Sequence, residues 1–408
     1  MEIPLNLPSG DRQQEFIDQV NAALRRISSG SSGSGGFGAD GSFEASATGV
    51  YRFESGMEPQ LTWTLRKAPE GTLSTVGVVA VQPNPPTGWD QAAQRLVTAA
   101  LAATVAGTRK RFFQRISFAY VGPALDGEYW LPGFRLAPAI PDDAEPASPL
   151  VERWVDVDMN VDAIDAQHAS AIAGERGRRI AARLSLLLDL GFERPPLEFR
   201  WVMVRQDDDR FESIRCQIMF RRADQQPSAM PDKGALGPLG RFRGDFPRYM
   251  TVGNRVQLPQ DVRRVLRGAD TKPHPIGDAF DSCARLYQVA RVGGRQFPSV
   301  LLAYTIAAAE AITNADRSYG GFADFMRQHS GAGDAKPDPF LEYLYREVRS
   351  AHFHAGKFPL GEFAPFRTDP LMDSNWVETS QLRLAGVMTV RAAILDWCLK
   401  KVAADPEP

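Results

Sequence analysis

The segment 344–356 carries the side chains best suited to chemistry, and it reads Leu-Tyr-Arg-Glu-Val-Arg-Ser-Ala-His-Phe-His-Ala-Gly. It places Arg349, Ser350 and His354 close together and holds two of the five histidines in the chain. Arginine has a permanent positive charge in a planar fork that matches phosphate oxygens. Histidine can take and give a proton near neutral pH. Together these residue types indicate cleavage of a phosphodiester without a metal ion.

The spacing of these groups poses a geometric problem on a regular helix. An α-helix advances about 100° per residue, so Arg349 and His354 lie about 140° apart around its axis. Three arrangements would bring them together. The helix could loosen near Gly356, the long arginine could reach round it, or two copies of the chain could share one site beside a two-fold axis. The two side chains flank an apolar stripe made of Leu341, Leu344, Val348, Ala351 and Ala355.

The other polar and aromatic side chains of the segment have simpler interpretations. His352 lies at the margin of the apolar stripe, where a core histidine bonded to a neighbour is expected. Arg346 and Glu347 are expected to be surface charges. Tyr343 and Tyr345 are expected to pack, although a tyrosine beside a phosphate site could stack a base.

The region that carries this segment is predicted to be helical. After Pro275 the strand patterns nearly vanish, and apolar residues recur at helical spacing. This pattern predicts a compact all-α bundle over residues 276–403, with the arginine–histidine segment on its fourth helix. The expected helices are 277–292, 296–315, 321–330, 338–355 and 378–403.

Residues 43–260 are predicted to form an α+β domain with a largely antiparallel sheet. Alternating or continuous apolar runs predict its strands, and longer helical periods predict two helices, at 89–107 and 163–191. Proline, glycine and charge then predict a linker over 261–275, with a short helix near 259–268. The expected strands are 61–65, 74–82, 116–122, 151–159, 198–205 and 214–220.

Residues 1–42 are predicted to be a short amphipathic helix over 10–28 followed by a flexible glycine- and serine-rich linker. Within that linker, Gly33, Gly35 and Gly38 match the dinucleotide-binding fingerprint by letter. The fingerprint needs a strand before it and a helix after it. Here a helix precedes it and a strand-like run follows, which favours a solvated linker.

The length, charge and cysteine content of the chain limit the number of domains and the kinds of site that we expect. A length of 408 residues predicts two domains. The net charge of −2 and pI near 6.3 leave nucleic-acid contact to a local patch. Three scattered cysteines without a CxxC pair predict no zinc site and fit a reducing cytoplasm. The start Met-Glu-Ile-Pro lacks a signal pattern, and no apolar run is long enough to predict a membrane span.

One basic run could supply such a patch. Arg109, Lys110, Arg111 and Arg115 surround two phenylalanines and could touch an RNA backbone through charge and stacking. A solvated helix end that leads into a strand is the alternative interpretation. The acidic runs at 142–145 and 207–209 look like loops, and their spacing predicts no metal site and no cofactor.

The segment from Arg349 to Gly356 resembles the signature of HEPN domains, which has an arginine, a polar residue, a few variable positions and a histidine. The preceding Leu344-Tyr345, an upstream helix with Glu310, and the run Arg317-Ser-Tyr-Gly-Gly-Phe resemble the bacterial Apea-like branch. The resemblance covers about 275–403.

This resemblance assigns Arg349 and His354 to the catalytic pair, Ser350 to the polar position, and Glu310 to a glutamate that orients the arginine. Arg346 and His352 also fit the looser family spacing, so two registers stay open. The family implies a metal-independent endoribonuclease, often a homodimer, that acts on RNA in toxin–antitoxin or anti-phage defence systems. An antitoxin or a phage-derived trigger would then be a partner, and by analogy residues 43–260 would sense or target.

Three hypotheses follow. In the first, His354 moves a proton and Arg349 holds the scissile phosphate while RNA is cut through its 2′-hydroxyl. In the second, the helical domain is catalytically inactive and serves as an RNA-binding, dimerisation or scaffold module. In the third, the match is accidental, and Arg349 and His354 lie far apart.

Overall fold

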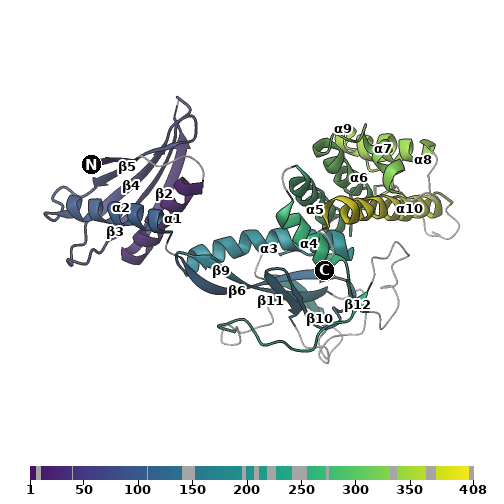
Figure 1. Ribbon diagram of the computed structural model, residues 1–408, viewed down its shortest axis with the longest axis horizontal. Helices are drawn as coiled ribbons and strands as arrows, with labels where there is room; N and C mark the ends of the chain where they lie inside the picture. The colour runs from purple at the N-terminus through teal and green to yellow at the C-terminus, as the bar shows by residue number, and fades with distance from the viewer. Residues whose placement is uncertain are drawn as a thin grey trace. The chain divides into compact units, whose positions relative to one another are not determined.

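The computed structural model of the chain divides into two compact units (Figure 1). Unit 1 is Met1–Phe112 with Val161–Ile172, and unit 2 is Phe113–Asn160 with Ala173–Pro408. The residues that the structure describes are 1–5, 11–38, 40–107, 109–139, 152–194, 199–205, 211–217, 227–240, 255–272, 275–330, 338–363 and 374–403.

Unit 1 contains an antiparallel sheet with two helices packed on it (Figure 1). Its strand order is β1 (Glu2–Pro4), β5 (Leu73–Ala80), β4 (Gln60–Lys67), β3 (Phe43–Tyr51) and β2 (Ser28–Phe37). Helices α1 (Asp11–Ile27) and α2 (Trp89–Ala106) share one apolar core with the sheet. Phe16, Trp63 and Val97 are buried in that core, one each from α1, β4 and α2. The predicted helices and strands of this region are therefore confirmed.

The prediction of a flexible linker after α1 is wrong. Residues Ser28–Phe37 form β2, an exposed edge strand paired along its length with β3. The hydroxyls of Ser34 and Ser46 lie 2.9 Å apart across this pair, and the rings of Phe37 and Phe43 pack at 5.1 Å. Glycine and serine offer little side-chain packing, but their backbone groups still pair wherever a neighbouring strand has an open edge. The glycine run lies between a helix and a strand, as expected, so it does not have the context of a dinucleotide fingerprint.

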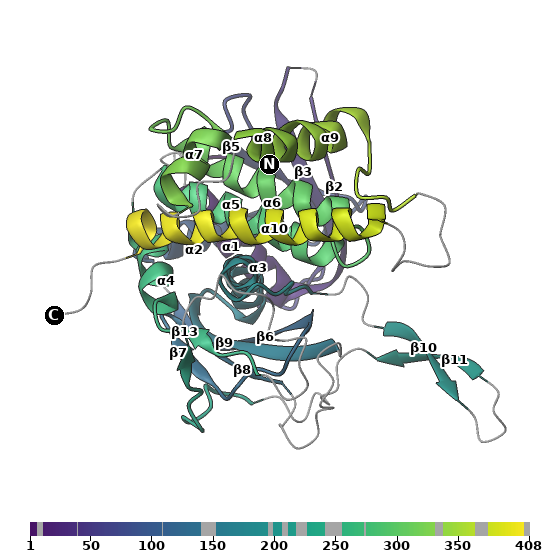
Figure 2. The same ribbon diagram turned by 90° about the vertical axis from the view of Figure 1, so that its right-hand side faces the viewer.

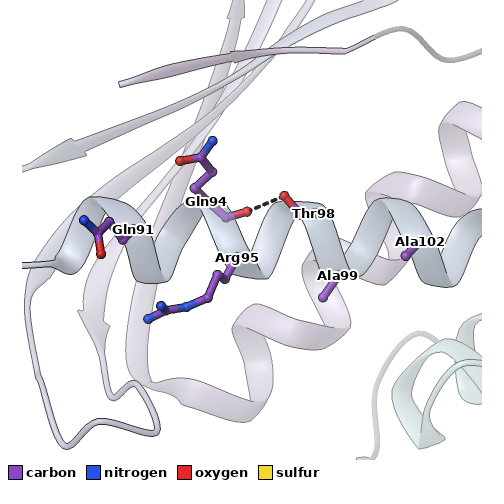
Figure 3. A pocket seen from close by; sticks show the side chains of 6 residues that line it. All are labelled: Gln91, Gln94, Arg95, Thr98, Ala99 and Ala102. Atoms are coloured by element: carbon purple, nitrogen blue, oxygen red, sulfur yellow. Dashed lines mark hydrogen bonds between the residues drawn. The ribbon is translucent and has the colours of Figure 1, made fainter.

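The outward face of α2 carries a shallow hollow with a volume of about 460 Å³ (Figure 3). All of its lining residues come from this one helix, and only Arg95 among them is charged. Polar groups from other elements do not converge on it, which distinguishes it from a built ligand site. The lining residues are Gln91, Gln94, Arg95, Thr98, Ala99 and Ala102.

The second sheet has the strand order β6 (Lys110–Val121), β9 (Glu152–Ala163), β8 (Phe134–Pro138) and β7 (Tyr129–Leu131). Helix α3 (Ala166–Leu188) lies along it (Figure 1). A Cβ atom at Gly177 of α3 would come within 2.7 Å of Ile116 in β6, so glycine permits this close approach. Two small strand pairs complete the β structure: the antiparallel β10 (Phe199–Arg205) and β11 (Phe211–Gln217), and the parallel β12 (Leu239–Gly240) and β13 (Leu258–Pro259).

The strand predictions for this region match β6, β9, β10 and the described part of the 214–220 run. Residues 218–220 and the acidic runs at 142–145 and 207–209 lie outside the described residues.

The C-terminal region is helical, as predicted (Figure 2). Helix α10 packs against α6 and α7, and the chain that carries the arginine–histidine segment packs against α6. Burial raises the pKa of the Cys283 and Cys398 thiols, which fill this core. The helices are α4 (Val262–Thr271), α5 (Ile276–Gly293), α6 (Pro298–Ala315), α7 (Phe322–His329), α8 (Asp338–Tyr343), η4 (Leu344–Ser350), α9 (Ala351–Ala355), α10 (Ser374–Trp397) and η5 (Cys398–Val402).

The C-terminal helices belong to the same compact unit as the four-stranded sheet, which differs from the predicted division at 261–275. Arg183 of α3 explains why. Its guanidinium donates hydrogen bonds of 2.7 Å to Asp281 of α5 and to Asp270 of α4. Arg391 of α10 donates to the carbonyl oxygens of Leu186 and Leu187 at the end of α3. Buried arginines therefore tie α3 to three C-terminal helices.

A buried histidine links α7 to α10. His329 is 6% exposed, its Nδ1 lies 2.7 Å from a carboxylate oxygen of Asp396, and its Nε2 lies 2.8 Å from the Tyr319 hydroxyl. We expect His329→Ala to lower the free energy of unfolding by about 2 kcal/mol, because the substitution removes both hydrogen bonds and a buried ring.

Urea denaturation and amide hydrogen exchange in α7 and α10 measure that loss. The matched control is His354→Ala, since an exposed histidine should change stability by less than about 0.5 kcal/mol. Equal stability of the two variants would contradict a structural role for His329.

Candidate functional site

The arginine–histidine segment lies on one helical run whose middle is π-helical. The run begins as α8, widens over η4 (Leu344–Ser350) and ends as α9. Leu341, Leu344 and Val348 are at most 3% exposed, whereas Ala351 is half-buried and Ala355 is exposed, so the predicted apolar stripe is buried only over its first part. Gly386 of α10 permits close packing there, because a Cβ atom would lie 3.1 Å from Leu344 and 2.7 Å from Leu302. The buried face turns the polar side of the run toward solvent.

The structure brings Arg349 and His354 together within one chain. Arg349 Nη1 lies 3.2 Å from His354 Nε2, and Arg349 Nε donates to Glu310 Oε2 of α6 at 2.5 Å. In η4 the backbone N–H of Ala351 reaches the carbonyl of Arg346, five residues back. A π-turn holds one more residue than an α-turn, which moves residues five apart toward the same face, and such turns are frequent at functional sites. The π-helical segment ends at Ser350 and residues 351–355 are α-helical, so the reach of the long arginine side chain brings the two groups together.

The contact between Arg349 and His354 restricts how the two groups can bond. A guanidinium has only N–H donors, so a hydrogen bond between them uses the lone pair of His354 Nε2. His354 is exposed, whereas the side chain of Arg349 is only 23% exposed and is held by Glu310. The site therefore pairs a fixed cation with a solvent-accessible base.

Aromatic rings surround the guanidinium. The Cζ of Arg349 lies 5.6 Å from the ring centre of Tyr345 and 5.4 Å from that of Phe353. Tyr345 stacks on Phe322 of α7, and Phe353 meets Tyr304 of α6 edge to face. Tyr345 and Phe353 are 39% and 40% exposed. The cation is therefore held between rings that also present open faces to solvent.

His352 bonds a neighbour, as expected, but it is half-buried and not a core residue. Its Nδ1 donates to the carbonyl oxygen of Lys357 at 3.0 Å, and its ring packs edge to face on Phe358. The helix ends at Gly356, which has a left-handed φ of 61°. Beyond it, the Ser299 hydroxyl donates to Glu362 at 2.8 Å and ties the following loop to the start of α6. His352 therefore fixes the chain behind the site.

The two registers left open by the spacing are distinguished by their contacts. Arg346 is 70% exposed and pairs with Glu342 at 3.2 Å, one turn back on its own helix, and it does not contact His352. Glu347 is also exposed, as expected. The geometry favours Arg349 with His354. Ser350 ends η4 half-buried, and its hydroxyl has no hydrogen-bond partner among the described residues, so it is available to a ligand.

The basic run near residue 110 does not form a single cationic surface. Arg115 is only 8% exposed and donates to both carboxylate oxygens of Asp158, at 2.5 and 2.7 Å. Desolvation opposes the charge of Arg115, but the bonds to the neighbouring carboxylates outweigh it and raise the pKa of Arg115. This burial corrects the expectation that Arg115 contacts RNA, because a guanidinium satisfied by a buried carboxylate is not available to phosphate.

The other three cations of this run are exposed. Arg109 pairs with Glu15 at 3.3 Å, Arg111 pairs with Asp162 at 3.4 Å, and Lys110 is exposed. Exposed ion pairs of this kind are weak and can exchange partners. These three residues are compatible with a solvated surface, the alternative interpretation of the run.

Phe353 and Tyr304 are site residues that the sequence patterns did not single out. Phe353 stands between the two histidines and lies outside the apolar stripe of its helix. A large aromatic residue at such a position could have been recognised from the sequence. Tyr304 lies on α6, six positions before Glu310, and only the packing of α6 against α9 brings it to the site.

Within the described residues, histidine, cysteine and carboxylate side chains form no group of three or more placed to hold a metal ion. No helix among them is long and apolar enough to cross a membrane. The chain matches no protein-family model, no curated protein and no solved structure.

Proposed function

We propose that this chain is a metal-independent endoribonuclease of HEPN type. The observation that carries the proposal is the chain of contacts from Glu310 through Arg349 to His354, with an exposed imidazole at its end. A permanent cation beside a neutral imidazole supplies the two functions that phosphodiester cleavage by an internal nucleophile requires.

In the proposed reaction, the 2′-hydroxyl of a ribose attacks the adjacent phosphorus. The lone pair of His354 Nε2, released from its contact with Arg349, accepts the hydroxyl proton as the new O2′–P bond forms. The P–O5′ bond breaks, and the departing oxygen takes a proton from solvent. The products are a 2′,3′-cyclic phosphate and a 5′-hydroxyl. The step moves protons and one phosphorus–oxygen bond and needs no oxidant or cofactor.

Arg349 is proposed to hold the phosphate during this step. Its Nε–H and one Nη1–H are engaged, which leaves about three of its five N–H groups for phosphate oxygens. Glu310 fixes the orientation of the fork, so little reorganisation accompanies the growing negative charge. Ser350 is proposed to position the same phosphate through its unpartnered hydroxyl.

The test is cleavage of end-labelled single-stranded RNA by the purified full-length protein in excess EDTA. We expect cleavage at an unchanged rate and products with cyclic-phosphate ends, because the proposed groups are all side chains. The control repeats the reaction with added Mg²⁺. Complete dependence on added metal would overturn the proposal.

A second candidate function is an inactive RNA-binding or dimerisation module. Four large side chains exposed around the site favour it, since an open aromatic face suits stacking on a base or on a second copy of the chain. These residues are Tyr343, Tyr345, Phe353 and Phe363.

A homodimer through the C-terminal helices, and a partner such as an antitoxin or a phage-derived trigger, are further proposals. These proposals rest on the resemblance to HEPN domains. The same resemblance is the ground for proposing a cytoplasmic location, a part in anti-phage defence, and a sensing or targeting role for residues 43–260.

A further inference from the structure

A second pocket lies in unit 2, between α3 and α5, and it shares no residue with the Arg349–His354 site. Its volume is about 810 Å³, within the range of small-molecule sites. Unlike the hollow on α2, it draws residues from several elements, including β6, α3 and α5. Apolar side chains line part of it, among them Phe118 of β6 and Val289 and Val292 of α5. The pocket thus combines an apolar wall with a charged rim.

Three of the four carboxylates that line this pocket have cationic partners. Asp281 accepts a 2.7 Å bond from Arg183, which lies outside the pocket lining. Glu193 pairs with Arg295 at 2.8 Å, and Glu175 pairs with Arg179 at 3.0 Å. Asp278, the remaining acidic lining residue, also has an interaction partner. Three of the four negative charges of the rim are therefore compensated within the protein.

Three of the four arginines that line the pocket lack such partners within the part of the chain that the structure describes. Arg178 of α3 and Arg194 are exposed and have no ion pair with any described residue. Arg285 of α5 makes its hydrogen bond to a backbone oxygen, the carbonyl of Asp281 at 3.1 Å. Three guanidinium groups thus line one pocket without a carboxylate partner among the described residues. Guanidinium groups whose N–H donors have no carboxylate partner are suited to bind an anion.

We propose that this pocket binds a small phosphorylated organic ligand of the nucleotide class. Guanidinium forks bind phosphate oxygens in pairs, so three of them offer about six N–H groups. A single carboxylate accepts about four hydrogen bonds, which leaves donors unused, whereas a di- or triphosphate accepts more. The apolar wall of Phe118, Val289 and Val292 suits a base or another flat apolar group.

Calorimetric titration of the full-length protein with ATP, inorganic pyrophosphate and adenosine, without metal, tests the proposal. We expect saturable binding of ATP, weaker binding of pyrophosphate, and adenosine binding weaker than ATP by about tenfold or more, because adenosine lacks the charges. The double substitution Arg178→Gln with Arg194→Gln should weaken ATP binding by about tenfold or more, because it removes charge-assisted bonds.

Two controls separate this site from others. Arg176→Gln removes an exposed arginine of α3 that does not line the pocket, and Arg349→Ala removes the cation of the proposed ribonuclease site. Both should leave ATP binding unchanged, so this test is independent of the ribonuclease proposal. No saturable binding of ATP or pyrophosphate, or equal weakening by Arg176→Gln, would overturn the site. Pyrophosphate binding as tight as ATP binding would overturn the organic part of the ligand.

Discussion

Replacing His354 by alanine should abolish detectable RNA cleavage while the protein stays folded. In the proposed reaction His354 is the group that accepts the 2′-hydroxyl proton, and general acid–base catalysis contributes about 10²–10⁴-fold to a rate. The imidazole is exposed, and its described contact is a single bond from Arg349, so its removal should cost little stability. Initial rates on end-labelled RNA, with circular dichroism and binding affinity measured on the same samples, check this result.

The matched control for His354 is His352, two positions earlier. His352 bonds a backbone carbonyl behind the site and does not contact Arg349, so His352→Ala should keep measurable activity. A His354→Ala protein that cuts at the wild-type rate would exclude the proposed base. If the wild type binds RNA tightly but yields no product ends, and His354→Ala binds equally well, the inactive binding module becomes the better description.

Replacing Arg349 should lower the cleavage rate by about 10²–10³-fold, the loss typical of removing a donor that stabilises developing charge. Arg349→Lys should be nearly as damaging as Arg349→Ala, although it keeps the charge. A lysine ammonium cannot hold Glu310 and His354 with separate edges of a rigid fork while it also faces a phosphate. Single-turnover rates at saturating protein measure this loss separately from RNA affinity.

Arg346 supplies the control for charge alone. It stands one turn earlier on the same run, and it pairs outward with Glu342. Arg346→Lys and Arg346→Ala should change the rate by less than about threefold, since an exposed ion pair contributes little. If the Arg346 variants lose as much activity as the Arg349 variants, the register Arg346 with His352 would replace the one proposed here.

Several elements were predictable from local pattern because burial repeats along the chain. The stripe of Leu341, Leu344 and Val348 indicated which face of the helix is buried, and the structure confirms it. The spacing of apolar residues in α2 and β4 also predicted these elements, because one face of each is buried in a core. The strand β2 was not predictable in this way, because its side chains are exposed and only the neighbouring β3 gives its backbone a partner.

The same distinction between local pattern and tertiary contact applies to the candidate site. The sequence by itself determined which residue types could do the chemistry and which side of their helix meets solvent. It did not determine that Arg349 reaches His354, because the arginine is held in place by Glu310, 39 residues away in the chain. Nor did it reveal that Arg115 is neutralised by Asp158, 43 residues away. The spacing of apolar residues indicates which face of a single element is buried. Ion pairs between residues far apart in the chain form only when separate elements pack together.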